Sequence, residues 1–90
     1  MTLTDGSSQP LRDLLLEAVR HAQAGDWQAA HVIVQEHDPD PFAAWIHAVV
    51  HRMEGDLDKA RYWYGRCGRS LRARLSTEAE LREIEAALRG

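Results

Sequence analysis

The residues whose types and spacing could carry chemistry lie on one short segment, from His47 to Glu54. His47, His51 and Glu54 are four and then three residues apart, so a helix would bring the three side chains onto one face. Two histidines one turn apart form half of a common zinc arrangement, and a carboxylate one turn further could be a third ligand or a base. The segment lacks the H-E-x-x-H pattern, and a third ligand would most easily come from another helix. Helix pairing makes His31 the best candidate.

A structural role for these histidines is the alternative, in which each ring hydrogen-bonds to a neighbour inside the fold. The sequence leaves open a metal or proton-transfer site, a structural role and a surface position. Nucleophilic and phosphate chemistry are not indicated, because the chain has no G-x-S-x-G motif and no Gly-rich phosphate loop. We therefore assign no catalytic residue and expect a non-enzymatic protein, with zinc as the one cofactor that the sequence allows.

Composition indicates one soluble globular domain. The chain has 90 residues, a net charge of −3 and 44% hydrophobic residues. We expect this domain to span residues 10–90, after a disordered lead over residues 1–9 that lacks the basic and apolar regions of a signal peptide. No apolar run reaches membrane-spanning length. The single cysteine, Cys67, is typical of a small buried hydrophobic residue in a reducing compartment. A cytoplasmic protein without membrane contact is the expectation.

Positive charge is concentrated between Lys59 and Arg74, where six cations occur without a carboxylate. Tyr62, Arg66 and Arg69 share one stripe of the predicted helix and form a candidate basic patch. Such a block could meet an acidic partner, a phosphate or RNA. The alternative is a solvated face that is partly paired with the acidic last helix. The net negative charge of the chain argues against nucleic acid.

Five helices are predicted from apolar spacing and from their end signals. The first follows an apolar stripe from Leu11 to Ala22, and the second follows Asp26 as its N-cap. The third runs from Pro41 to Glu54 and is apolar nearly all the way round, so we place it at the centre of the domain. The fourth runs from Leu57 to Cys67.

The fifth predicted helix begins near the sequence STEAE. Thr77 and Glu80 have the spacing of a capping box, and Ser76 is the alternative cap. Further along, the helical spacing of three apolar residues gives this helix one apolar side, formed by Leu81, Ile84 and Leu88.

An internal repeat of thirty residues relates the first two helices to the next two. The segment AVRHAQAGDWQAA aligns with AVVHRMEGDLDKA, which superposes Gly25-Asp26 on Gly55-Asp56 and His21 on His51. In each copy the glycine permits a left-handed turn and the aspartate caps the following helix. Neither helix pair can bury its apolar face alone, so the two pairs must stack.

The second copy resembles the tetratricopeptide-like helical repeats. Counted from Gly55, the positions of Ala60, Tyr64 and Cys67 match the small, aromatic and small residues of that family. The first copy departs from the pattern, with Val34 at the aromatic position, and the period is thirty instead of about thirty-four. The resemblance covers residues 11–68 and implies an all-α fold of two stacked antiparallel helix hairpins, to which we add a C-terminal capping helix.

The family resemblance also implies protein or peptide binding in a concave apolar groove. By alignment, six residues would line it: Leu15, Val19, Phe42, Trp45, Val49 and Arg52. The fifth helix could instead fill this groove, or two copies of the chain could bury it in a homodimer. The segment WIHAVVHRMEGDLDKARYWYGRCGR is also similar to a group of small uncharacterised bacterial proteins. The predicted function is a protein-interaction module, and the alternative is a small metal-binding or catalytic protein centred on the histidines.

Overall fold

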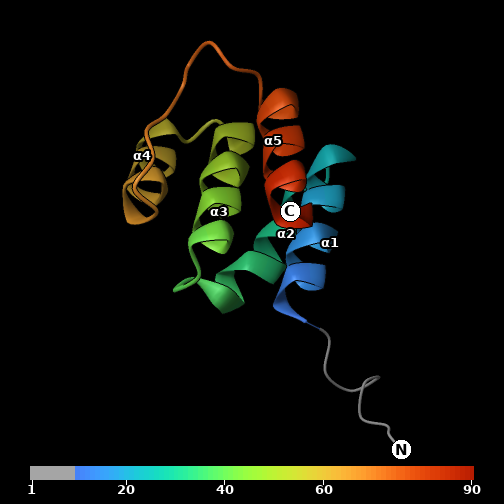
Figure 1. Ribbon diagram of the computed structural model, residues 1–90. Helices are drawn as coiled ribbons and strands as arrows, with labels where there is room; N and C mark the ends of the chain where they lie inside the picture. The colour runs from blue at the N-terminus through green and yellow to red at the C-terminus, as the bar shows by residue number, and fades with distance from the viewer. Residues whose placement is uncertain (1–9) are drawn as a thin grey trace, which may run out of the picture.

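The structure, a computed structural model, describes residues 10–90, and the lead predicted over residues 1–9 lies outside them. The described elements are α1 (Leu11–Gln23), α2 (Trp27–Val34), the short 3₁₀ turn η2 (Gln35–His37), α3 (Pro41–Glu54), α4 (Leu57–Arg66) and α5 (Thr77–Arg89) (Figure 1). This part of the chain contains helices and no strand, which confirms the all-α class. None of these helices is long and apolar enough to span a bilayer.

The turns that join α1 to α2 and α3 to α4 have the same geometry. Gly25 has a φ of 87° and Gly55 a φ of 93°, a left-handed region that strongly favours glycine. The next residue, Asp26 or Asp56, donates its backbone N–H to the carbonyl five residues earlier at 2.9 Å in both turns. The aspartate side chains then accept the backbone N–H three residues further on, at 3.1 Å in each case. The sequence repeat therefore corresponds to a repeated turn.

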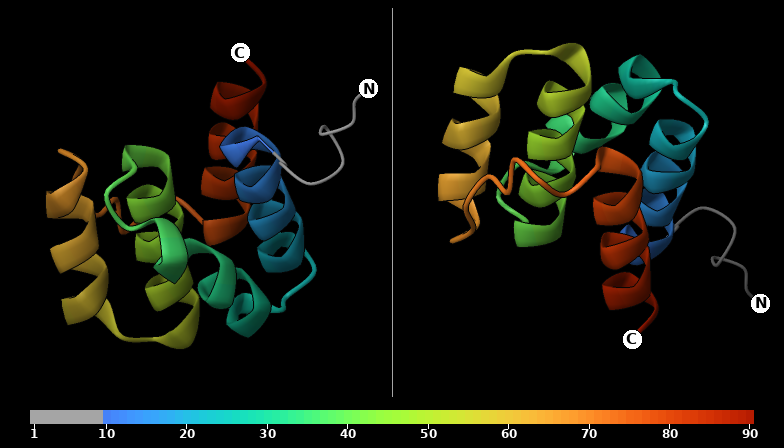
Figure 2. Two further views of the ribbon diagram at one scale, coloured as in Figure 1. Left: turned by 90° about the horizontal axis from the view of Figure 1, so that it is seen from below. Right: turned by 90° about the horizontal axis from the view of Figure 1, so that it is seen from above.

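Helix α3 is the central element. Asp40 caps it by accepting the backbone N–H groups of Phe42 and Ala43 at 2.8 and 3.1 Å, and Pro41 occupies its first turn. All residues from 43 to 51 are buried, because α1, α2, α4 and α5 all pack against this helix. Figure 2 shows α4, α3, α2 and α1 in succession, with α5 on the side opposite α2. Helix α3 thus presents one face to α2 and another to α5.

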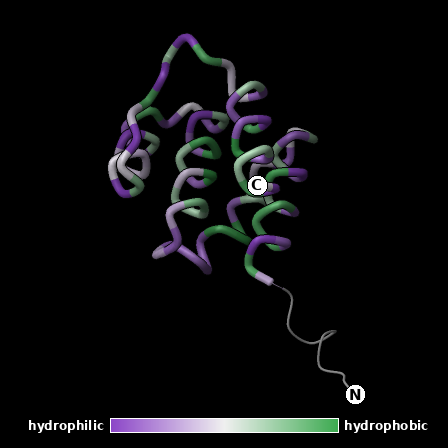
Figure 3. The backbone as a smooth tube through the Cα atoms, viewed as in Figure 1, coloured by the Kyte–Doolittle hydropathy of each residue, from purple (hydrophilic) through white to green (hydrophobic). Residues whose placement is uncertain are grey.

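The fifth helix covers the apolar groove of α1 and α3 that was predicted as a binding surface. It packs against α1 and α3 through its apolar side, formed by Leu81, Ile84 and Leu88. Figure 3 shows hydrophobic and hydrophilic residues alternating along the α1 and α5 tubes, as expected for helices with one buried side. Of the six predicted groove residues, four are buried and two are partly buried: Leu15, Val19, Trp45 and Val49, then Phe42 and Arg52. Helix α5 fills the groove within a single chain.

A buried carboxylate, Glu80, fastens α5 to the rest of the fold. Its side chain is 1% exposed and accepts hydrogen bonds from Trp45 Nε1 at 2.8 Å and from the Tyr64 hydroxyl at 2.7 and 2.8 Å. The Arg52 guanidinium pairs with it at 2.7 Å. Burial and the bond to Glu80 raise the pKa of Tyr64. Ser76 is the cap of α5, and Glu80 instead joins α5 to α3 and α4.

Candidate metal centre

Three histidine side chains meet between α2 and α3. His31 comes from α2, and His47 and His51 come from successive turns of α3. One ring nitrogen of each lies within 4.8 Å of those of the other two, and His31 Nε2 is 3.1 Å from His47 Nε2. Two nitrogens on one tetrahedral zinc ion are roughly 3.3 Å apart, given Zn–N bonds of about 2.0 Å. The His31–His47 separation therefore matches two ligands of a single ion, and the other two pairs, which lie within 4.8 Å, would have to shorten by at most about 1.5 Å to complete a three-histidine set.

Two carboxylates orient the α3 histidines from behind. His47 Nδ1 is 3.3 Å from Asp38 Oδ1, and His51 Nδ1 is 2.8 Å from Glu54 Oε1. Because a carboxylate accepts and does not donate, the ring proton of each histidine lies on Nδ1, and each Nε2 presents its lone pair. This is the carboxylate–histidine–metal pattern of many zinc sites. Glu54, expected as a ligand or base, holds a ligand candidate in place.

Local sequence explains how these groups come together. The spacing of four residues puts His47 and His51 on one side of α3, and that side faces α2. The Gly25-Asp26 turn reverses the chain so that His31 on α2 faces the same space. The segment after η2 then places Asp38 behind the His47 ring, shortly before Asp40 starts α3.

The centre is largely shielded from solvent. His47 is 4% exposed and His51 is 7% exposed. The Trp63 ring of α4 stacks on the His47 ring with centroids 3.9 Å apart and an interplanar angle of 11°. Burial lowers the pKa of His47 from 6.5 to about 4, and the neighbouring His31 adds to this effect while Asp38 opposes it. His47 is therefore neutral at physiological pH, which is the form that binds metals.

The three residues of the predicted basic patch, Tyr62, Arg66 and Arg69, do not form one surface: Tyr62 and Arg66 contact each other on α4, and Arg69 contacts Trp45. Tyr62 is 57% exposed on α4 and accepts a hydrogen bond from Arg66 at 3.0 Å. Arg69 instead lies over the Trp45 ring, with its guanidinium carbon 3.4 Å from the ring centroid. Cys67 is partly buried, and burial raises the pKa of its thiol, so a reactive thiolate is not favoured.

Sequence reasoning did not assign Asp38 or Trp63 to the histidine centre. Asp38 belongs to a cluster of acidic residues next to two prolines, and Trp63 belongs to a run of three aromatic residues on the fourth predicted helix. No local spacing links either residue to His47, because the contacts depend on how α2 and α4 pack against α3. In the sequence, the histidine centre was indicated by one signal, the pair His47 and His51 on an otherwise apolar helix.

Comparison with known proteins gives no family assignment. No protein-family model, curated protein or solved structure matches the chain. The tetratricopeptide-like resemblance therefore stays a prediction, and the geometry of the histidine centre is the basis for a function.

Proposed function

We propose that this protein binds a divalent transition-metal ion, with zinc as the physiological choice, through His31, His47 and His51. The observation that carries the proposal is the convergence of three ring nitrogens within 4.8 Å of one another from two different helices. The bound ion would link α2 to α3 and so stabilise the stacked helices.

The chemistry of the donors supports a borderline first-row cation. Imidazole nitrogen suits zinc, copper and nickel, whereas magnesium and calcium prefer oxygen ligands. Asp38 and Glu54 hold the Nδ1 protons of two histidines, so their Nε2 atoms need no change of tautomer to bind a metal. Three protein ligands also leave one position of a tetrahedral ion for water or for a ligand from another molecule.

Thermal unfolding of the metal-free protein with and without zinc tests this function. At a free zinc concentration one hundred times the dissociation constant, binding adds about 2.7 kcal/mol to the free energy of unfolding. For a domain of this size, that corresponds to a rise in Tm of about 10 to 20 °C. Magnesium at the same concentration should leave the Tm unchanged.

The repeat supplies a matched control for the histidine variants. His51→Ala should abolish the zinc response, whereas His21→Ala, at the equivalent position of the first repeat, should retain it. His21 lies on α1 beside Glu17, away from the three histidines. An equal response in both variants would contradict the proposed ligands.

Protein interaction through the apolar groove stays a second prediction. Because α5 covers the groove residues, a partner would first have to displace this helix. The Glu80 contacts with Trp45, Tyr64 and Arg52 oppose such a displacement.

A further inference from the structure

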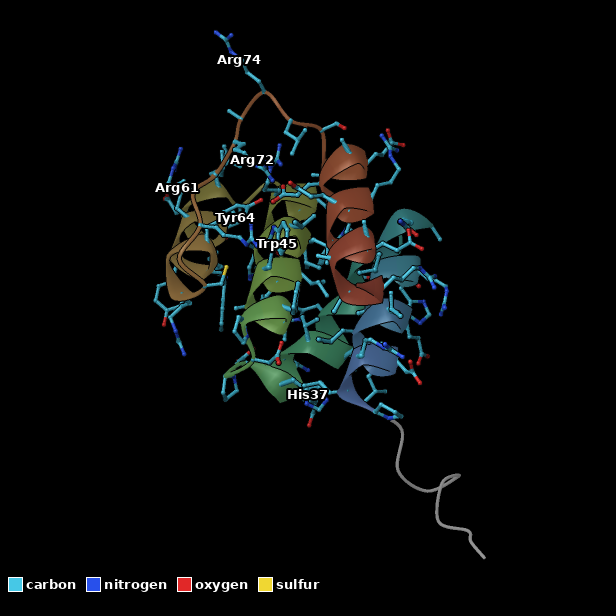
Figure 4. The ribbon with its side chains drawn as sticks, in the orientation of Figure 1. His37, Trp45, Arg61, Tyr64, Arg72 and Arg74 are labelled. Atoms are coloured by element: carbon cyan, nitrogen blue, oxygen red, sulfur yellow. The ribbon has the colours of Figure 1, made fainter. Side chains whose placement is uncertain are left out.

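An open hollow lies on the side of the molecule formed by α4 and the chain that leads to α5. Its volume is about 490 Å³, and its lining includes Arg61, Gly65 and Arg69 together with Leu71 and Ala73 of the connecting segment. In Figure 4, Arg61 and Arg74 project outward from α4 and this segment, while Tyr64 points toward the centre of the fold. The hollow does not include the three histidines and has no part in the metal centre.

Gly65, which lines the hollow, is not required by the fold. It lies inside α4, its φ is not positive, and a Cβ built on it would meet nothing within 4 Å. Glycine is the poorest helix former after proline, so almost any other residue would favour α4 more. What glycine does provide is an exposed stretch of helix backbone that a ligand can approach closely.

Two arginines line the hollow together with this glycine. Arg61 lies on α4 one turn before Gly65, whereas Arg69 follows the end of α4 at Arg66 and reaches the hollow from the segment after Gly68. Arg69 is held in position by its contact with the Trp45 ring. Within residues 10–90, Arg61 pairs with Asp58 alone, an exposed contact at 3.3 Å that another carboxylate can replace at little cost.

The sequence around the hollow is rich in positive charge, although the chain is negative as a whole. Six cations and no carboxylate occur between Lys59 and Arg74, against a net charge of −3 for the protein. Three of the six form ion pairs with carboxylates outside this segment: Lys59 with Asp56, Arg61 with Asp58 and Arg72 with Glu83. Charge of one sign beside an open hollow attracts a ligand of the opposite sign.

We propose that this hollow binds an acidic peptide segment of a partner protein. An apolar side chain of the peptide would rest on Gly65 against Leu71 and Ala73, and carboxylates on both sides of it would pair with Arg61 and Arg69.

The lining distinguishes a peptide from a nucleic acid. Single-stranded nucleic acid is usually held by exposed aromatic rings on which bases stack. The exposed aromatic residue of α4, Tyr62, does not line the hollow, and the Tyr64 ring at its edge is buried and bonded to Glu80. Leu71, Ala73 and Gly65 instead give the lining an apolar part, which suits an aliphatic side chain.

Fluorescence polarisation with a synthetic peptide tests the proposal. The probe is a fluorescein-labelled peptide with one leucine between two pairs of glutamates, and it is titrated with the full-length protein at low and high salt. We expect saturable binding that weakens as salt is raised. A peptide with glutamines in place of the glutamates, and one with alanine in place of the leucine, should each bind at least about fivefold more weakly.

Matched variants locate the site. Arg61→Gln and Gly65→Leu should each weaken binding by at least about fivefold, the first by removing a charge and the second by filling the hollow. Arg82→Gln makes the same change, and Ala86→Leu introduces the same leucine side chain, at exposed positions of α5, and both should leave binding unchanged. Circular dichroism should show that all four variants keep their helices.

Three results would overturn the proposal. These are the absence of saturable peptide binding, equal binding by Gly65→Leu and the unsubstituted protein, and tighter binding of a single-stranded RNA of the same net charge as the peptide. Zinc-loaded and metal-free protein should bind the peptide equally, because the hollow shares no residue with the histidine centre.

Discussion

Replacing Glu80 with alanine should strongly destabilise the fold. The carboxylate is 1% exposed and is bonded to three side chains from α3 and α4: Trp45, Arg52 and Tyr64. Its removal leaves the Arg52 guanidinium, whose side chain is 10% exposed, without its charge partner. Breaking a buried ion pair from one side costs about 3 to 5 kcal/mol, and this corresponds to a fall in Tm of about 12 to 40 °C for a domain of this size.

Urea unfolding followed by circular dichroism measures this loss. Glu83→Ala is the matched control, because Glu83 pairs with Arg72 on the same side of the fold but both side chains are 46% exposed. That substitution should cost less than about 1 kcal/mol. If Glu80→Ala does not fold, Glu80→Gln keeps the shape and one acceptor and should cost about 2 to 3 kcal/mol. Equal stability of the Glu80→Gln variant and the unsubstituted protein would refute the argument that this carboxylate fastens α5.

Three further predictions concern Gly65, His47 and the two carboxylates that contact the α3 histidines. Gly65→Ala should raise the free energy of unfolding by about 0.5 to 1 kcal/mol in urea titrations, because the added Cβ meets no atom and alanine favours the helix; a loss of stability would contradict this. In metal-free protein with chelator present, burial lowers the pKa of His47 from 6.5 to about 4. Between these two pH values the unfolded chain binds more protons than the folded chain, so the free energy of unfolding falls as the pH is lowered. Between pH 7 and pH 5 the loss due to this histidine should be about 2 kcal/mol and should be missing in His47→Gln. Asp38→Asn and Glu54→Gln should each weaken zinc binding by about 10 to 100-fold in competition with a chromophoric chelator, and unchanged affinities would remove these carboxylates from the centre.

The helices and their ends could largely be predicted from the sequence. Asp40-Pro41 and Gly55 carry start and stop signals that act within a few residues, so the bounds of α3 were predicted as the structure has them. The repeated Gly-Asp turns belong to the same class of local signal. The all-α class follows from such signals and is confirmed.

Contacts between distant segments could not be predicted in the same way. The spacing of Thr77 and Glu80 fits a capping box, but Glu80 faces inward because α5 crosses to α1 and α3, where Trp45 and Arg52 need an acceptor. Nothing local to α5 specifies that crossing. For the same reason, the sequence could name His31 as a third ligand candidate but not its distance from His47.

Cobalt titration of the metal-free protein tests the central claim most directly. Cobalt in a tetrahedral site absorbs visible light more strongly than hydrated cobalt, so binding can be followed by absorbance and then reversed by adding zinc. We predict that the absorbance saturates at one ion per chain, is lost in His31→Ala and His51→Ala, and is kept in His21→Ala. A titration without this band, or the same band in His31→Ala, would contradict a metal centre formed by His31, His47 and His51.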